Sequence, residues 1–255
     1  MEKAEIEQLL HQLAPKDPLK LPGNAEQYAV KNVVLNPDSP LKGKRIYFLG
    51  SSITLGAAAN DESFVDYLVA EDGIIAQKEA LSGTTLANSN QPLLKGNSYL
   101  ERLAKNPPKQ PLDLMVVQLS TNDGRKQIPL GQISSTKDMA TFDQQTTLGA
   151  LEYLCALVTQ NWVCPLAFYT CLRKGNDYQI LIAKLKVLQD KWGFSMIDLG
   201  SDEKIISVTQ QHPSYMYDDA HPTRLGYRDL WTPYFRKELL SIFKDQEVKL
   251  WSMQI

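Results

Sequence analysis

The chain has 255 residues, of which 43% are apolar and 22% are charged. This balance is typical of a folded protein with a sizeable core, and the length fits one α/β domain. The 27 basic and 29 acidic residues give a net charge of −2 without long runs of one sign, so we expect no nucleic-acid partner. The first twenty residues lack a long apolar run and no later stretch has membrane-spanning length, so we expect a cytoplasmic protein that does not bind the membrane.

Residues 1–43 are expected to form an N-terminal extension ahead of a main domain at 44–255. Residues 3–13 have the pattern of a short amphipathic helix, and the prolines that follow end it and start an extended segment. Two roles stay open for this extension: packing across the sheet edge, or contact with a second copy of the chain in a homo-oligomer.

Apolar runs of strand length alternate with helical patterns from residue 44 onward, which predicts a parallel sheet with helices on both faces. The strand candidates are 45–49, 74–80, 113–119, 165–170 and 195–199. The helix candidates are 63–71, 97–105, 142–160, 177–192 and 223–244. The irregular stretch 124–141 leaves the carboxyl end of the central strand candidate, where open α/β sheets bind ligands. It is either a pocket wall or lid, or a connecting loop.

Three cysteines, Cys155, Cys164 and Cys171, have neither the spacing of a metal site nor an even number for a disulfide framework. We expect them to be small buried side chains, with no metal bound.

A Gly50-Ser51-Ser52 turn directly follows the first strand candidate. Such a strand-to-helix turn presents side chains and backbone N–H groups at the carboxyl edge of the sheet. It can cap a helix with a serine, cradle an anion, or hold an exposed serine nucleophile.

Asp218 and His221 have the spacing Asp-x-x-His, which places both side chains on one face of a helical turn. A serine hydroxyl needs an imidazole to take its proton and a carboxylate to orient the ring. Of the three histidines, His11 falls in the N-terminal helix candidate, and His212 precedes a proline without a carboxylate at comparable spacing. His221 is therefore the expected general base.

Acyl transfer also needs hydrogen-bond donors for the oxygen that becomes negative. Gly83 follows the second strand candidate and offers a backbone N–H without a side chain to obstruct a substrate. Asn122 follows the third strand candidate and offers a side-chain amide. Either residue alone is also typical of an ordinary loop entry.

These blocks occur in the order found in SGNH (GDSL-type) hydrolases, which the chain resembles over roughly residues 44–244. The matching blocks are Gly50-Ser51-Ser52-Ile53-Thr54, Ser82-Gly83-Thr84, Thr121-Asn122-Asp123 and Asp218-x-x-His221-Pro222. The resemblance implies a flavodoxin-like three-layer α/β/α sandwich with a five-stranded parallel sheet. It implies a triad of Ser52, Asp218 and His221, and an oxyanion hole formed by the N–H groups of Ser52 and Gly83 and the Asn122 amide. It implies no metal and no organic cofactor.

The chain departs from the family pattern at two positions. Ser51 stands where the family usually has aspartate, and Ser120 stands where it usually has glycine. Neither change removes a proton-transfer group, so we expect catalysis to survive in a differently shaped pocket. The Gly-x-Ser spacing selects Ser52 over Ser51 as the nucleophile.

We therefore expect a serine ester hydrolase that works through an acyl-enzyme on a small soluble ester or an acylated carbohydrate. Two other classes stay open. One is a catalytically inactive SGNH-fold binding module, which the replacements at Ser51 and Ser120 would suit. The other is a flavodoxin-like phosphate or nucleotide binder that uses the 50–54 turn, although the turn is poor in glycine for a phosphate loop. Arg173, after the fourth strand candidate, either pairs with an anionic substrate group or is a solvated surface arginine.

Overall fold

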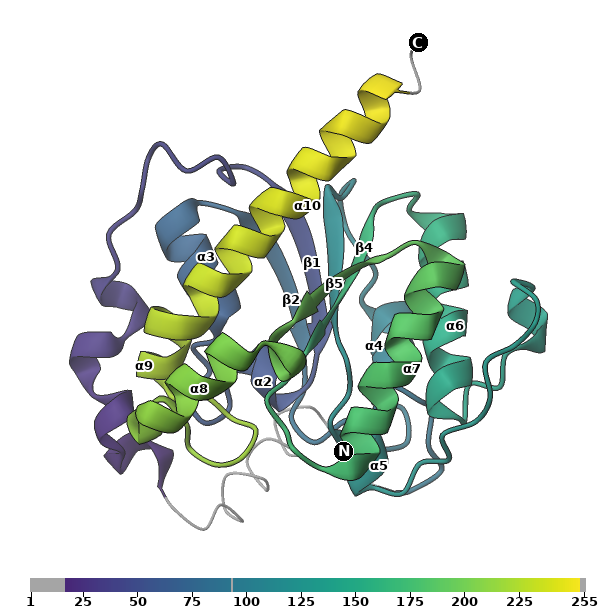
Figure 1. Ribbon diagram of the computed structural model, residues 1–255, viewed down its shortest axis with the longest axis horizontal. Helices are drawn as coiled ribbons and strands as arrows, with labels where there is room; N and C mark the ends of the chain where they lie inside the picture. The colour runs from purple at the N-terminus through teal and green to yellow at the C-terminus, as the bar shows by residue number, and fades with distance from the viewer. Residues whose placement is uncertain (1–16, 93, 253–255) are drawn as a thin grey trace.

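The computed structural model of the protein describes residues 17–92 and 94–252, and its centre is a five-stranded parallel sheet (Figure 1). The strands are β1 (Arg45–Gly50), β2 (Ile75–Ala80), β3 (Leu114–Gln118), β4 (Leu166–Thr170) and β5 (Ser195–Asp198). Their order is β2-β1-β3-β4-β5, with every pairing parallel, which is the flavodoxin-like order. All five strand predictions are confirmed. The strands were predicted from apolar runs. Strands β3 and β4 illustrate why such runs occur, because every residue of these two strands is buried.

Helices cover both faces of this sheet, which confirms the predicted three-layer fold. One face carries α3 (Phe64–Asp72) and α10 (Thr232–Ser252); the other carries α4 (Tyr99–Lys105), α6 (Thr147–Asn161) and α7 (Asn176–Trp192) (Figure 1). The shorter helices are α2 (Ser52–Leu55), α5 (Asn122–Arg125), α8 (Glu203–Gln211) and α9 (Arg224–Gly226), with a π-helical stretch at Tyr227–Trp231. The single helix expected at 223–244 is thus three consecutive segments that extend to Ser252.

Local capping explains where α3 begins and ends. The Ser63 hydroxyl accepts a hydrogen bond from the Val65 N–H, and the Asp66 carboxylate accepts one from the Ser63 N–H. Gly73 then ends the helix with a φ of +66°, a conformation that glycine adopts without steric cost.

Two helices differ from the sequence-based expectation, one in its first residue and one in having been missed. The helix expected at 142–160 begins at Thr147, because Thr146 caps it by accepting a hydrogen bond from the Gly149 N–H. The helix α8 was not predicted, although its sequence is amphipathic: Asp202 caps it, Ile205 is buried, and Ile206 and Val208 pack partly against the core.

The N-terminal extension was expected to be extended after its first helix. Where described, it contains four single turns of 3-10 helix: Pro18–Lys20, Pro22–Asn24, Glu26–Tyr28 and Val30–Asn32. The helix expected at 3–13, and His11 with it, lie outside the described residues. A domain boundary between residues 43 and 44 stays a prediction.

Aromatic rings join α3, α10 and β4 into one core. The rings of Phe64 and Phe235 stack with centroids 3.8 Å apart and planes 17° apart. Tyr169 on β4 meets Phe235 edge to face at 5.1 Å. Within residues 17–92 and 94–252, no helix is long and apolar enough to cross a membrane.

Candidate active site

Ser52, His221 and Asp218 lie together at the carboxyl edge of the sheet. Ser52 is the first residue of α2, two positions after the end of β1, whereas His221 lies in the turn before α9. The Ser52 Oγ is 2.7 Å from the His221 Nε2. On the other side of the ring, the His221 Nδ1 is 2.9 Å from both carboxylate oxygens of Asp218. The three side chains thus form a continuous chain of hydrogen bonds from hydroxyl to carboxylate.

The Asp218 carboxylate is oriented by its own turn as well as by the imidazole. Its Oδ1 accepts hydrogen bonds of 2.8 Å from the backbone N–H groups of Ala220 and His221. Burial raises the pKa of Asp218, but these bonds and the contact with the His221 ring outweigh burial and lower this pKa to about 2. Asp218 is therefore ionised at neutral pH and can stabilise a cationic imidazole.

The hydroxyls of Ser51 and Ser52 contact different residues. Ser51 is fully buried, and its Oγ accepts a hydrogen bond of 3.1 Å from the Gln118 Nε2. The Gln118 Oε1 in turn accepts from the Ser51 N–H at 2.9 Å and from the Thr54 Oγ1 at 2.9 Å. Gln118 therefore holds the turn that carries Ser52 while Ser51 points inward.

Gly83 and Asn122 are brought together through Thr84. The Asn122 Nδ2 donates a hydrogen bond of 2.9 Å to the Thr84 O, the carbonyl next to Gly83 in the chain. A side-chain amide has two N–H donors, so one remains for a ligand. Gly83 adopts a φ of +72°. Among the described residues, neither the Gly83 N–H nor the Ser52 N–H has a hydrogen-bond acceptor, so both are available to an oxyanion.

Arg102, which the sequence analysis did not identify, links this loop to the turn of Ser52. Its Nη2 donates to the Gly50 O at 2.7 Å and to the Thr84 Oγ1 at 3.3 Å. Its Nη1 donates to the buried Glu79 on β2 at 2.9 Å. One buried guanidinium thus fixes the end of β1 relative to the loop that contains Gly83.

Asp123 is a second residue that the sequence analysis missed in this role. Its carboxylate accepts hydrogen bonds from the backbone N–H groups of Leu86 and Ala87 at 2.8 and 3.2 Å, and from the Thr147 hydroxyl at 3.1 Å. Burial raises the pKa of Asp123 despite these bonds. The carboxyl therefore anchors the loop that follows Gly83 to the start of α5.

The Ser120 hydroxyl is accommodated by its own turn. Its Oγ accepts hydrogen bonds from the N–H groups of Asn122 at 3.2 Å and Asp123 at 3.4 Å. A glycine at this position could not make these bonds. Ser120 thus supports the backbone that presents Asn122.

Other residues considered from the sequence lie outside this cluster. His212 stacks on Tyr215 with ring centroids 5.0 Å apart. Arg173 is neither solvated nor free, because it is buried and its Nη1 donates to Asp177 at 2.7 Å. Cys155 and Cys171 are buried and Cys164 is partly buried, all as free thiols. In the described part of the chain, no group of three or more His, Cys, Asp or Glu side chains is arranged to hold a metal ion.

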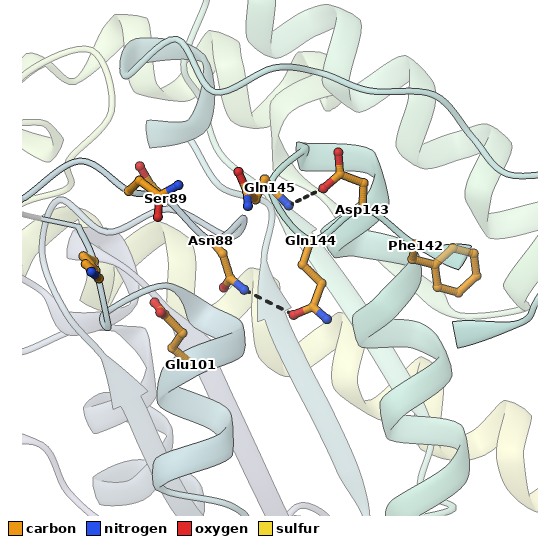
Figure 2. Close-up of a pocket in the computed structure, with 9 residues that line it drawn as sticks. Asn88, Ser89, Glu101, Phe142, Asp143, Gln144 and Gln145 are labelled. Carbon is orange, nitrogen blue, oxygen red and sulfur yellow. Dashed lines mark hydrogen bonds between the residues drawn. The ribbon is translucent and has the colours of Figure 1, made fainter. Parts of the chain in front are cut away.

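A polar pocket of about 400 Å³ lies between the loop after Gly83 and the segment before α6 (Figure 2). It is lined by Asn88, Ser89, Asn90, Lys95, Glu101, Phe142, Asp143, Gln144 and Gln145. Figure 2 shows Asn88 and Gln144 pointing toward each other, with the Asn88 Nδ2 donating to the Gln144 Oε1 at 3.2 Å, while Phe142 points away. An adjoining pocket continues along Gln127, Ile128 and Pro129. The first part of the 124–141 stretch therefore serves as a pocket wall.

The chain matches the model of a known protein family. The model of the GDSL-like lipase/acylhydrolase family matches residues 48–228. This range contains all five residues expected to act in catalysis, and the extension before residue 44 lies outside it. No curated protein sequence matches the chain.

Solved structures with the same fold include three that illustrate the likeness. A protein from Lactobacillus plantarum has a TM-score of 0.60 and 23% identity, and the match covers 80% of this chain and 98% of that chain. A protein from Bacteroides ovatus, assigned as a GDSL-like lipase, has a TM-score of 0.58 and 13% identity, covering 80% and 99%. An acetyl xylan esterase has a TM-score of 0.52 and 13% identity, covering 78% and 98%.

Proposed function

The chain belongs to the GDSL-like lipase/acylhydrolase family, and we propose that it is a carboxylic ester hydrolase with Ser52 as its nucleophile. The observation that carries this proposal is the 2.7 Å contact between the Ser52 Oγ and the His221 Nε2. A serine hydroxyl attacks an acyl carbon near neutral pH only when a base within hydrogen-bond distance takes its proton.

The proposed reaction has two steps. The Ser52 Oγ attacks the carbonyl carbon of the ester while His221 takes the hydroxyl proton. The bond to the alcohol then breaks, and His221 protonates the departing alcohol, which leaves an acyl group on Ser52. Water, losing a proton to His221, then attacks this acyl-enzyme, and His221 returns the proton to the Ser52 Oγ as the bond to the acyl group breaks and the acid leaves. Asp218 accepts the Nδ1–H of the ring and stabilises its cationic form, a role supported by its lowered pKa.

The oxyanion of each tetrahedral intermediate is stabilised by three donors: the N–H groups of Ser52 and Gly83 and the Asn122 amide. The contacts of Thr84 support this assignment, because Thr84 bonds to Asn122 through its carbonyl and to Arg102 through its hydroxyl. Preorganised donors of this kind each lower the activation barrier by roughly 3–4 kcal/mol.

We further propose that the ester is carried by a hydroxyl-rich alcohol, as in an acylated carbohydrate. The pocket of Figure 2 supports this class because its lining is rich in side-chain amides, which both donate to and accept from hydroxyl groups. Its lining begins at Asn88, five residues after Gly83 in the chain, and includes none of the proposed triad or oxyanion-hole residues, so we propose that it holds the part of the alcohol away from the ester bond.

Labelling with a fluorophosphonate probe tests the nucleophile directly. We expect mass spectrometry to locate the label on Ser52, and we expect Ser52→Ala to lose both labelling and hydrolysis of p-nitrophenyl acetate. The matched control is Ser135→Ala, which removes the hydroxyl of an exposed serine. A label on Ser51, or full activity in Ser52→Ala, would show that Ser52 is not the nucleophile. A folded wild-type protein that neither reacts nor hydrolyses any ester would support the inactive binding module instead.

Kinetics on two substrates test the alcohol class. Gln144→Ala is expected to raise KM for glucose 6-acetate, which keeps four free hydroxyls, about three- to tenfold, the effect of one lost hydrogen bond, while KM for p-nitrophenyl acetate stays the same. Gln160→Ala, at the exposed end of α6, is the control. An equal change for both substrates would argue against a sugar site at Gln144.

A further inference from the structure

The segment 17–32, here called the N-terminal strap, packs against the two loops that carry the proposed nucleophile and base. Figure 1 shows its purple turns beside α9, and Pro22–Asn24 contacts both α9 and the turn at Pro213–Tyr215. The strap lies outside the residues that match the family model, 48–228. The family match therefore does not account for its contacts.

Asn24 is the central residue of the strap. Its side chain is 3% exposed. Its Nδ2 donates a hydrogen bond of 2.7 Å to the Ala58 O, in the loop that follows Ser52 and α2. Its Oδ1 accepts a hydrogen bond of 2.8 Å from the backbone N–H of Arg224, in the turn that follows His221. One buried amide thus bridges the two segments that must meet for Ser52 to contact His221.

The Arg224 side chain makes a second connection between the strap and the loop that follows Ser52. Its Nη1 donates to the Asn24 O at 3.2 Å, and its Nη2 donates to the Glu62 Oε1 at 3.0 Å. Glu62 lies in the loop between α2 and α3, and its Oε2 also accepts the Val30 N–H at 3.0 Å. The strap, the loop that follows Ser52 and the turn that follows His221 are therefore joined by charge-assisted hydrogen bonds that are largely shielded from solvent.

Gly23 shows how closely the strap fits the turn before His221. A Cβ on Gly23 would lie 2.1 Å from the Ser214 O and 2.6 Å from the Thr223 Oγ1. The Thr223 Oγ1 itself donates to the Ser214 O at 2.7 Å. The strap backbone at Gly23 thus packs directly against Ser214 and Thr223, the two residues whose hydrogen bond closes this turn.

We propose that the strap is a positioning element of the active site, in which Asn24 sets the separation between the loop after Ser52 and the turn after His221. The proposal rests on the proposed function. Its physical basis is that proton transfer needs the two atoms at hydrogen-bond distance, and a displacement of about 1 Å from a remote change can cost about 100-fold in rate. Asn24 touches no reacting atom and acts through the backbone on both sides.

The test compares turnover per active site in wild type and Asn24→Ala. Active sites are counted by the stoichiometry of fluorophosphonate labelling at saturation, and kcat and KM are measured with p-nitrophenyl acetate. We expect kcat per labelled site to fall about 10- to 100-fold, with KM little changed, and the rate of labelling to fall in parallel. Asn36→Ala is the matched control, because Asn36 is an exposed asparagine whose side chain only accepts from the Asp38 N–H.

Two further variants separate positioning from stability. Asn24→Asp keeps an acceptor for the Arg224 N–H and loses the donor to the Ala58 O. We expect it to fold and to have a lower kcat, so it serves as the test if Asn24→Ala does not fold. Gly23→Ala, which removes no hydrogen bond, should lower kcat in the same way. Folded variants with a lower Tm but wild-type kcat per labelled site would overturn the proposal. A wild type without labelling would instead refute the proposed function itself.

Discussion

The Asp218 carboxylate has an orientation that does not depend on the imidazole. Two backbone N–H groups bind its Oδ1, so the side chain is in place whether or not His221 is charged. The Ser52 hydroxyl, by contrast, makes one hydrogen bond within residues 17–92 and 94–252, the one to His221. Of the three side chains, the Asp218 carboxylate is therefore the most firmly held, and it aligns the His221 imidazole.

Asp218→Asn tests the role of this carboxylate. An asparagine amide in its place would donate to the Nδ1 or leave it without a charged partner, which favours the wrong tautomer and removes the stabilisation of the cationic ring. We expect kcat with p-nitrophenyl acetate to fall about 10⁴-fold with little change in KM. The control is Asp219→Asn, which breaks an exposed ion pair with Arg125 and should leave kcat close to wild type. An active Asp218→Asn would remove Asp218 from the mechanism.

The lowered pKa of Asp218 also predicts a dependence of stability on pH. This pKa is about 2 in the folded protein, against an ordinary value of 3.8. The ionised carboxylate therefore stabilises the folded state above about pH 4, and this contribution is lost as the pH falls toward about 2. Urea unfolding should give a difference in free energy of unfolding between wild type and Asp218→Asn that shrinks over this range. A difference that stays constant down to pH 2 would contradict the lowered pKa.

At the scale of elements, the sheet was predictable because parallel strands are buried on both faces and are therefore written as continuous apolar runs, as in β1 and β3. Helix α8 was not predicted, although Ile205, Ile206 and Val208 give it an apolar face that packs toward the core. Gln118 carried a signal that was missed: a polar residue at the end of a buried apolar strand is uncommon and needs a partner. That partner, the Ser51 turn, is distant in sequence, so only the fold reveals the contact.

Gln118→Leu tests the link between β3 and the turn of Ser52. The substitution keeps a similar volume and removes the acceptor of the Ser51 N–H and of the Thr54 hydroxyl. Each buried donor left without an acceptor costs about 1–3 kcal/mol, and the loosened turn should lower kcat about 10- to 100-fold. Chemical denaturation and kinetics measure the two effects, with the exposed Gln160→Leu as control. Unchanged kcat in a destabilised variant would restrict Gln118 to a structural role.

At the scale of the whole molecule, the active site is assembled from the two ends of the family region. Ser52 follows the first strand, whereas Asp218 and His221 come after the last strand and α8. The contact between them therefore depends on completed folding of the sheet. The Tyr227 hydroxyl adds one direct tie, donating to the Ile53 O at 2.7 Å, and the strap adds the others. We therefore expect the stability of the sheet core and the positioning of these loops to rest largely on different contacts.

The substitution Phe194→Ala is expected to lower the stability of the protein without changing the positioning of the active site. Phe194 precedes β5 at the amino edge of the sheet, opposite the site, and its ring packs edge to face on Phe168 with centroids 4.7 Å apart. Truncation leaves a cavity and should cost about 3–5 kcal/mol, which lowers Tm by roughly 6–20 °C for a domain of this size. Because the contacts of Ser52 and His221 are untouched, kcat per labelled site at 25 °C should match wild type. A parallel loss of kcat would mean that the site responds to global stability, and the effect of Asn24→Ala would then need no positioning role.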